Sequence, residues 1–178
     1  RELLALIETI LDAARVEAGQ LTLVHDSVTV SDLCGDAIAR GRDLGADRPV
    51  EVVAEIVEGI GTLQVDRVRM GRALATFIGH ALRTAERDFI RVRAVPSRKP
   101  GMIRIDVEPR STRFSGRELG AMLDPVRQPG ESRHRGLALG LGLARAVVEL
   151  HGGSVGVTDL GPKGIVFTVR FSISPELD

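Results

Sequence analysis

Aromatic side chains are scarce in this sequence, which has no tryptophan, no tyrosine and five phenylalanines in 178 residues. Proteins that bind single-stranded nucleic acids usually stack bases on aromatic rings, so this class of function is disfavoured. An excess of charge of one sign is also absent, because 24 basic residues balance 24 acidic ones. Such a chain has no long-range field to attract a polyanion. We therefore expect neither nucleic-acid binding nor direct membrane contact.

Cysteine and long apolar runs are nearly missing as well. Cys34 is the only cysteine, which excludes an intrachain disulfide. No stretch approaches the roughly 20 apolar residues that span a bilayer, and no secretory signal opens the chain. These absences favour the reducing cytoplasm. The start at Arg1, within a helical pattern, suggests an excised fragment, with any membrane anchor upstream.

The length and the apolar fraction of 43% fit one domain with a single core and a short appendage. At the start, Leu4, Ile7, Leu11 and Ala14 alternate at spacings of three and four, which is typical of a helix that packs on another helix. Gly19 is expected to end this helix. Its apolar stripe packs either on an upstream helix or a second chain, or on the chain's own domain, and the spacing alone favours neither.

The remaining pattern predicts helices and antiparallel strands that alternate. Helices are expected at 31–44, 66–85, 115–123 and 141–150, the first three capped by Ser31, Asp66 and Ser115 and the last ended by Gly152 and Gly153. Strands are expected at 21–24, 28–30, 50–57, 89–95, 102–108, 154–159 and 165–173. Residues 127–136 are interpreted as a mobile loop. The order predicts an α/β (α+β) two-layer sandwich, with a mixed, largely antiparallel sheet and helices on one face.

Two stretches at opposite ends of the chain match known sequence patterns. Residues 10–19 read Ile-Leu-Asp-Ala-Ala-Arg-Val-Glu-Ala-Gly, and residues 140–153 run from Gly-Leu-Gly-Leu-Ala to Glu-Leu-His-Gly-Gly. With the helix between them, they resemble the histidine-kinase branch of the ATPase superfamily that also contains gyrase, the heat-shock chaperones and MutL. The resemblance implies that residues 1–19 are the second helix of a dimerisation and phosphotransfer domain. Residues 20–178 would then form the ATPase-like domain.

Gly140 and Gly142 resemble the second glycine box of that family. Glycines at the start of a helix let backbone N–H groups approach a polyphosphate, whose charge the helix dipole favours. The alternative is that both glycines merely permit close packing of the lid on the helix. Family members usually have a further glycine where this chain has Ala138, which is a small loss of backbone freedom.

The helix that Asp66 caps is similar to the family's asparagine box, in which two asparagines four residues apart face the nucleotide. Thr76 and His80 stand at these positions. The resemblance implies that the second position binds magnesium, for which an imidazole nitrogen is a poor ligand because magnesium prefers hard oxygen donors. His80 is therefore interpreted as a packed or pocket-facing side chain rather than a metal ligand. Arg83 replaces a common lysine and either meets an anion or is solvated.

The largest departure follows the strand at 102–108. Where the family has an aspartate that accepts the adenine amino group and two glycines that open the pocket, this chain has Pro109, Ser111 and Arg113. An unpaired adenine amino group costs on the order of 1 to 3 kcal/mol. Asp106 and Glu108 lie in the wrong register to replace the aspartate, so they are interpreted as a solvent face.

The region corresponding to the lid also differs from the family. Leu123-Asp124-Pro125-Val126 replaces the usual phenylalanines beside a proline. The basic residues that follow, Arg127, Arg133, His134 and Arg135, are interpreted as solvated rather than as a phosphate site.

The phosphoacceptor histidine that the resemblance implies is not apparent in this chain. His25 precedes an acid, as the family's phosphoacceptor does, but it lies between strand patterns and is interpreted as a surface residue. His151 is interpreted as structural.

These features together predict a degenerate histidine-kinase-like module of bacterial two-component signalling. We expect it to regulate and to scaffold rather than to phosphorylate, with no cofactor expected and ATP with magnesium only if the pocket still functions. The expected partners are a response regulator or a partner histidine kinase, and a second copy bound through the first helix and a missing upstream helix. The expected location is the cytoplasm, including the cytoplasmic part of a membrane-anchored sensor.

Two other functions remain open from the sequence. One is an active ATP-dependent histidine kinase with an atypical pocket. The other is a histidine phosphotransfer protein that carries a relic ATPase-like domain. They differ from the preferred hypothesis in nucleotide binding and in the presence of an upstream phosphoacceptor histidine.

Overall fold

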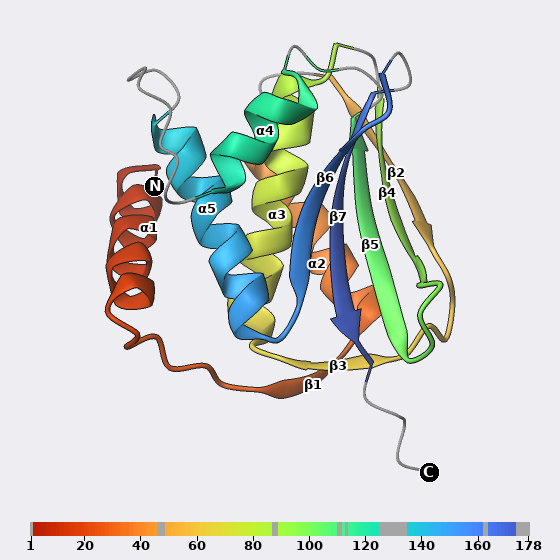
Figure 1. Cartoon of the computed structure of the whole chain (residues 1–178), viewed down its shortest axis with the longest axis horizontal. Coiled ribbons are helices and arrows are strands. Elements are labelled where there is room, and N and C mark those ends of the chain that lie inside the picture. The colour runs from red at the N-terminus through yellow and green to blue at the C-terminus, as the bar shows by residue number, and fades with distance from the viewer. Residues whose placement is uncertain are drawn as a thin grey trace.

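A computed structural model describes residues 2–45, 49–86, 89–109, 112, 114–124, 135–161 and 164–173. Figure 1 shows the elements in chain order, which are α1(Glu2–Glu17), β1(Asp26–Thr29), α2(Val30–Leu44), β2(Glu51–Ile56), β3(Thr62–Val65), α3(Arg67–Thr84), β4(Phe89–Pro96), β5(Met102–Pro109), α4(Gly116–Leu123), α5(Arg135–Leu150), β6(Ser154–Asp159) and β7(Ile165–Ser172).

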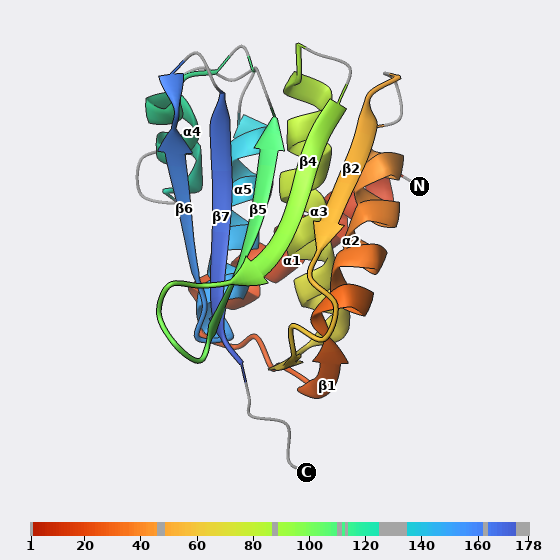
Figure 2. The ribbon, with the colours of Figure 1, turned by 90° about the vertical axis from the view of Figure 1, so that its right-hand side faces the viewer.

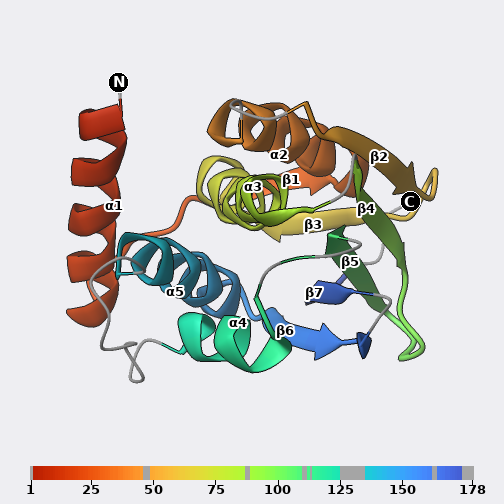
Figure 3. The same cartoon turned by 90° about the horizontal axis from the view of Figure 1, so that it is seen from above.

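A five-stranded sheet in the order β2-β4-β5-β7-β6 forms one layer of the domain. Only the β2–β4 pair is parallel among these neighbours, and the other three pairs are antiparallel. Helices α2, α3, α4 and α5 all lie on one face of this sheet, and α1 stands on the far side of the helical layer (Figures 2 and 3). The expected two-layer sandwich with a mixed, largely antiparallel sheet is therefore confirmed.

Helix α3 is the central element of the helical layer. Asp66 caps it as predicted, because its Oδ1 accepts a hydrogen bond of 3.0 Å from the backbone N–H of Arg69. The helix buries a broad apolar face that includes Leu74, Phe77 and Ile78. Phe77 lies against Phe167 of β7, with ring centroids 5.6 Å apart, so α3 is anchored directly on the sheet.

The N-terminal part of the domain differs from the prediction. Residues 21–24 are not a strand, and β1 instead pairs antiparallel with β3, a strand that was not predicted. Helix α2 begins at Val30 and not after Ser31, because the hydroxyl of Thr29 accepts a 3.1 Å hydrogen bond from the N–H of Asp32. Each of these two strands has only four paired residues, which is too short for the alternation of apolar and polar residues to predict the strand from the sequence.

Helix α5 begins at Arg135, six residues before the predicted start at 141. The later start is predicted because residues 127–136 have little apolar content, and because Gly136 lowers helix propensity by about 1 kcal/mol. The buried side chains of Leu141 and Val148 pack on the core and stabilise the helix. Most of the predicted loop at 127–136 lies outside the described residues, but 135 and 136 are helical.

The prediction that Asp106 lies on a solvent face is wrong. Asp106 is on the sheet face opposite the helices, yet it is 3% exposed. It accepts a 2.9 Å hydrogen bond from the Thr168 hydroxyl and forms a 2.9 Å ion pair with Nε of Arg104. Glu108, on the same face, is half-buried between Arg91 and other charged side chains. Long arginine side chains cover the acids that strand alternation alone would expose.

Candidate functional site

The position that corresponds to the magnesium ligand of the family's asparagine box is taken here by a buried side chain. His80 is 0% exposed, and its ring centroid lies 5.8 Å from that of Phe114 and 5.6 Å from that of Phe167. The contact with Phe167 is edge-to-face, at 88°. Of the two interpretations of His80, the structure therefore supports a packed side chain. An imidazole enclosed by two phenyl rings is placed as a core residue and not as a ligand.

Thr76 lies one turn before His80 on α3 and remains partly accessible. Its hydroxyl donates a 2.9 Å hydrogen bond to the Arg72 carbonyl in the preceding turn. This backbone bond is the usual state of threonine within a helix. The hydroxyl lacks the amide group that the family's first asparagine would present.

Pro109 is the last residue of β5 and is buried beside Ile90 of β4, with which it is paired in register. Its ring offers neither a carboxylate nor an N–H to a purine. Ser111 and Arg113, the other two altered positions of this motif, lie outside the described residues. Thr112 between them forms a bridge with Ala85, so the chain here returns to the end of α3.

Arg83 has a structural role that neither interpretation from the sequence anticipated. Its Nη1 donates a 2.9 Å hydrogen bond to the carbonyl of Leu44, the last residue of α2. Cations at a helix C-terminus satisfy free carbonyls and favour the helix dipole. Burial lowers the pKa of Arg83. Arg83 thus joins α3 to α2.

Gly140 and Gly142 lie inside α5 and not at its start, contrary to the expectation for a phosphate-binding glycine box. Backbone N–H groups in the interior of an α-helix are bonded to the preceding turn. Among the described residues, a Cβ on Gly142 would meet nothing within 4 Å and one on Gly140 would meet only Thr76, at 3.7 Å. The other expected use, close packing against the lid, concerns residues outside the described ones and stays a prediction.

A cavity of 380 Å³ opens between α1, α2, α3 and α5. Thr76 and Gly140 line it, whereas His80 and Pro109 do not. Its walls combine apolar side chains of α5 with charged residues, namely Asp12, Arg40, Asp43, Arg69 and Arg72. Thr76 and Gly140 therefore border an open space, while His80 at the magnesium position and Pro109 at the adenine position are buried.

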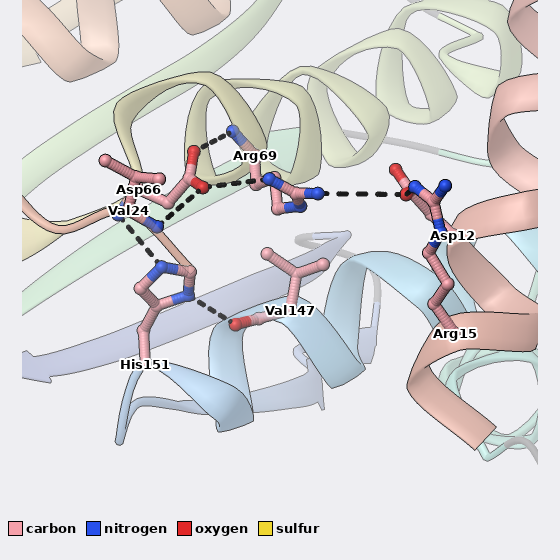
Figure 4. A network of polar contacts seen from close by, with 7 residues as sticks. All are labelled: Asp12, Arg15, Val24, Asp66, Arg69, Val147 and His151. Carbon is pink, nitrogen blue, oxygen red and sulfur yellow. Dashed lines mark hydrogen bonds and ion pairs between the residues drawn. The ribbon is translucent and has the colours of Figure 1, made fainter. Parts of the chain in front are cut away.

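A polar network joins four elements next to this cavity (Figure 4). Oδ2 of Asp66 accepts from the Val24 N–H at 3.3 Å and forms an ion pair with Arg69 at 3.0 Å, and Arg69 reaches Asp12 of α1 at 4.0 Å. The Asp66 N–H donates to Nε2 of His151 at 2.9 Å. From the sequence, Asp66 is predicted only as a cap and His151 only as a structural residue, because contacts between such distant residues leave no local pattern.

Two groups of this network have shifted pKa values. Burial opposes ionisation of Asp66, but hydrogen bonds from the N–H groups of Arg69 and Val24, and the Arg69 guanidinium, outweigh it and lower the pKa of the carboxyl group. Burial lowers the pKa of His151, and the nearby His25 adds to this effect, against the hydrogen bond to the Val147 carbonyl. At neutral pH the network therefore holds a carboxylate and a neutral imidazole.

Metal binding finds no support in the side chains that the structure describes. Within that part of the chain, no three residues among histidines, cysteines, aspartates and glutamates gather as a metal-binding group.

His25 is exposed, as predicted, and its ring packs edge-on to that of His151, with ring centroids 5.4 Å apart. In the part of the chain that the structure describes, each helix is either too short or too polar to cross a bilayer.

The family assignment follows from sequence comparison. Residues 65–175 match the family of histidine kinase-, DNA gyrase B- and HSP90-like ATPases, and the chain belongs to that family. The matched segment contains α3, β5 and α5, which carry the positions discussed above.

The relatives with curated descriptions are sensor proteins of bacteria. The chain is 30% identical over 91% of its length to the sensor protein DivL of Caulobacter vibrioides, and 29% identical over 87% to the virulence sensor protein BvgS of Bordetella parapertussis. It spans 20% and 13% of the length of these two relatives. Family membership therefore places the chain among two-component sensor histidine kinases, of which it represents one part.

Solved structures confirm the fold. The full-length ShkA structure in complex with AMPPNP superposes with a TM-score of 0.78 at 21% identity, over 97% of this chain and 36% of that one. The histidine kinase AdeS of Acinetobacter baumannii gives a TM-score of 0.72 at 15% identity, over 95% and 77%. At such low identity the likeness concerns the fold alone.

Members of this family bind ATP with magnesium, but the described residues do not fit that ligand. His80 is enclosed by aromatic rings where an amide oxygen is needed, and Pro109 has no acceptor for an adenine amino group. Gly140 and Gly142 have helical backbone and present no free N–H groups. No step of phosphoryl transfer can be derived from this set of residues.

Proposed function

We propose that this chain is a regulatory module of a two-component sensor, in which the histidine-kinase ATPase fold is kept and nucleotide binding is lost. The enclosed position of His80 between Phe114 and Phe167 is the observation that carries this proposal. His80 stands at the position that corresponds to the magnesium ligand, where a hydrated magnesium ion needs space and an oxygen ligand. Opening it would require the displacement of core aromatic side chains.

Residues 1–19 are proposed to act as a dimerisation helix. Ile7, Ile10 and Leu11 of α1 are 44%, 49% and 50% exposed, so this apolar face does not pack on the domain. The opposite side of α1 contacts the domain, through the ion pair of Asp12 with Arg69 and through packing near α5. A helix with a free apolar stripe gains stability by packing against other helices, which favours a bundle with an upstream helix and a second copy over packing on its own domain.

The self-association can be tested in the whole protein by sedimentation equilibrium. Changing Ile7 and Leu11 to glutamate is expected to weaken the dimer by at least tenfold, since each buried leucine or isoleucine contributes about 1.5 to 3 kcal/mol. Val57, which is 43% exposed and lies just after β2, provides the matched control for an added glutamate. Equal dissociation of both variants would contradict a dimer interface on α1.

The proposed partners are a response regulator or a partner histidine kinase, in the cytoplasm of a bacterium. Support comes from the family and from the sensor proteins that the chain resembles. In this scheme the ATPase-like domain is a docking and regulatory surface, and its effect on a partner does not depend on catalysis.

Ligand-dependent stability distinguishes this proposal from an active kinase. A kinase with a dissociation constant near 50 μM would gain about 2.7 kcal/mol of unfolding free energy in about 5 mM ATP with magnesium. We expect no gain for this chain in urea unfolding with and without the nucleotide. A gain of this size would refute the proposal. Transfer from a phosphorylated response regulator to the whole protein, without ATP, would instead favour the phosphotransfer function.

A further inference from the structure

His151 is held in one protonation state by the atoms around it. Its Nδ1 lies 2.7 Å from the carbonyl oxygen of Val147, and its Nε2 lies 2.9 Å from the backbone nitrogen of Asp66. A carbonyl only accepts, so Nδ1 carries the proton, and the Asp66 N–H requires a lone pair on Nε2. This arrangement exists only for the neutral ring with its proton on Nδ1.

The ring stands where the N-terminal helix is attached to the domain (Figure 4). Asp66 connects His151 to two anchors, the Val24 N–H of the segment between α1 and β1 and the Arg69 guanidinium that reaches Asp12 of α1. The two anchors share one carboxylate oxygen, Oδ2 of Asp66. Any change at Asp66 therefore acts on the attachment of the segment and of α1 together.

A second proton on His151 would disturb these contacts in two ways. Nε2 would become a donor opposite the donating N–H of Asp66, which breaks that hydrogen bond. The imidazolium would also compete with Val24 and Arg69 for the Asp66 carboxylate. Among the described residues, the charged and titratable groups that face the ring are Asp66 and Arg69 from α3 and His25 from the connecting segment.

His25 lies next to this ring from the connecting segment. It is exposed, it belongs to the segment that the network holds, and its ring centroid is 5.4 Å from that of His151. A positive charge on His151 would therefore arise at the boundary between the segment and the domain.

We propose that His151 is a proton-operated latch, which holds α1 and residues 18–25 on the ATPase-like domain while its ring is neutral and releases them when the ring is protonated. The release changes the orientation of the dimerisation helix relative to the domain. The latch requires no nucleotide, so nucleotide binding by this chain would contradict the function proposed above but not the latch.

Distance measurements by electron paramagnetic resonance between spin labels at Glu17→Cys and Val57→Cys test the latch. Both positions are exposed, one at the end of α1 and one on the domain. The native Cys34 does not interfere, because it is 1% exposed and burial raises the pKa of its thiol to about 12. A second pair, Val57→Cys with Val68→Cys, lies entirely on the domain and reports its integrity.

The first pair should give one narrow distance near pH 7.5. A second, broader population should appear as the pH falls below the ordinary histidine value of about 6.5 and through the lowered pKa of His151. The domain pair should not change. A change in both pairs would mean unfolding, and no change in the first pair would mean no latch. Either result would overturn the proposal.

Two variants assign the response to one ring. His151→Gln keeps an acceptor but cannot be protonated, so the second population should be absent throughout this pH range. His25→Gln leaves His151 in place and should retain the response. Loss of the response in His25→Gln alone would show that the wrong histidine was chosen. If His151→Gln does not fold, NMR titration of the unaltered protein decides, since the midpoint of His151 protonation must coincide with release.

Discussion

Replacement of Gly142 by alanine should stabilise the protein. Alanine is about 0.8 to 1.0 kcal/mol more favourable than glycine in a helix interior, and Gly142 lies seven residues after the start of α5 at Arg135. A new Cβ would meet no heavy atom of the described residues within 4 Å, so no steric strain from them offsets the gain. The free energy of unfolding should therefore rise by about 1 kcal/mol.

Urea unfolding followed by circular dichroism measures this change. With a slope of about 2 kcal/mol per molar urea, the midpoint should move up by roughly 0.5 M. Gly153→Ala is the matched control in the turn after α5, where a Cβ would lie 2.5 Å from Phe171 and 2.8 Å from Val148. Overpacking of this kind costs about 1 to 3 kcal/mol, so this midpoint should fall.

A neutral or destabilising effect of Gly142→Ala would refute the reasoning. It would mean that this glycine adopts a backbone conformation in solution that alanine resists, as a nucleotide-binding loop requires. The assignment of residues 140–142 to a continuous helix would then be wrong.

Three further predictions concern charged groups. Asp66→Asn should lower the free energy of unfolding at neutral pH but not in strong acid. The pKa of Asp66 is lowered from 3.8, so its carboxylate stabilises the folded state above that value, and this contribution is lost as the pH falls through the lowered pKa. Urea unfolding at a series of pH values measures this loss. Asp106→Ala should cost about 1 to 3 kcal/mol in the same assay, because it leaves the buried Thr168 hydroxyl unpaired. Arg67→Ala should leave the urea midpoint unchanged, since its 2.8 Å ion pair with Asp36 is exposed to solvent.

The sequence predicted those elements whose signals are local. Asp66 and Ser115 cap α3 and α4 as expected, because a side-chain oxygen bonds to an N–H only three residues away. Gly19 ends α1 in a left-handed conformation with φ of 64°, again a local requirement. The strands from β4 onward followed from alternation and from the turn residues between them.

Features that depend on distant contacts could not be predicted. The burial of Asp106 comes from Thr168, 62 residues away on β7. The hydrogen bond between Asp66 and His151 spans 85 positions, although each residue was recognised separately. The early start of α5 was also missed, because the low helix propensity of glycine predicts a later start, whereas packing on the core stabilises the longer helix.

The candidate site shows the same division. The resemblance identified which positions had changed, namely Thr76, His80 and Pro109, because motif spacing is visible in a sequence. Whether His80 faces a pocket or the core depends on two rings that are distant in sequence. Phe114 lies just before α4 and Phe167 lies on β7. Ser111 and Arg113 lie outside the described residues and stay predictions.

Isothermal calorimetry with ATP and magnesium tests most directly whether the nucleotide site has been lost. If the site has been lost, neither the unaltered protein nor His80→Ala should give a measurable heat of binding at millimolar nucleotide. A saturable isotherm with a micromolar dissociation constant, lost when magnesium is removed, would contradict it.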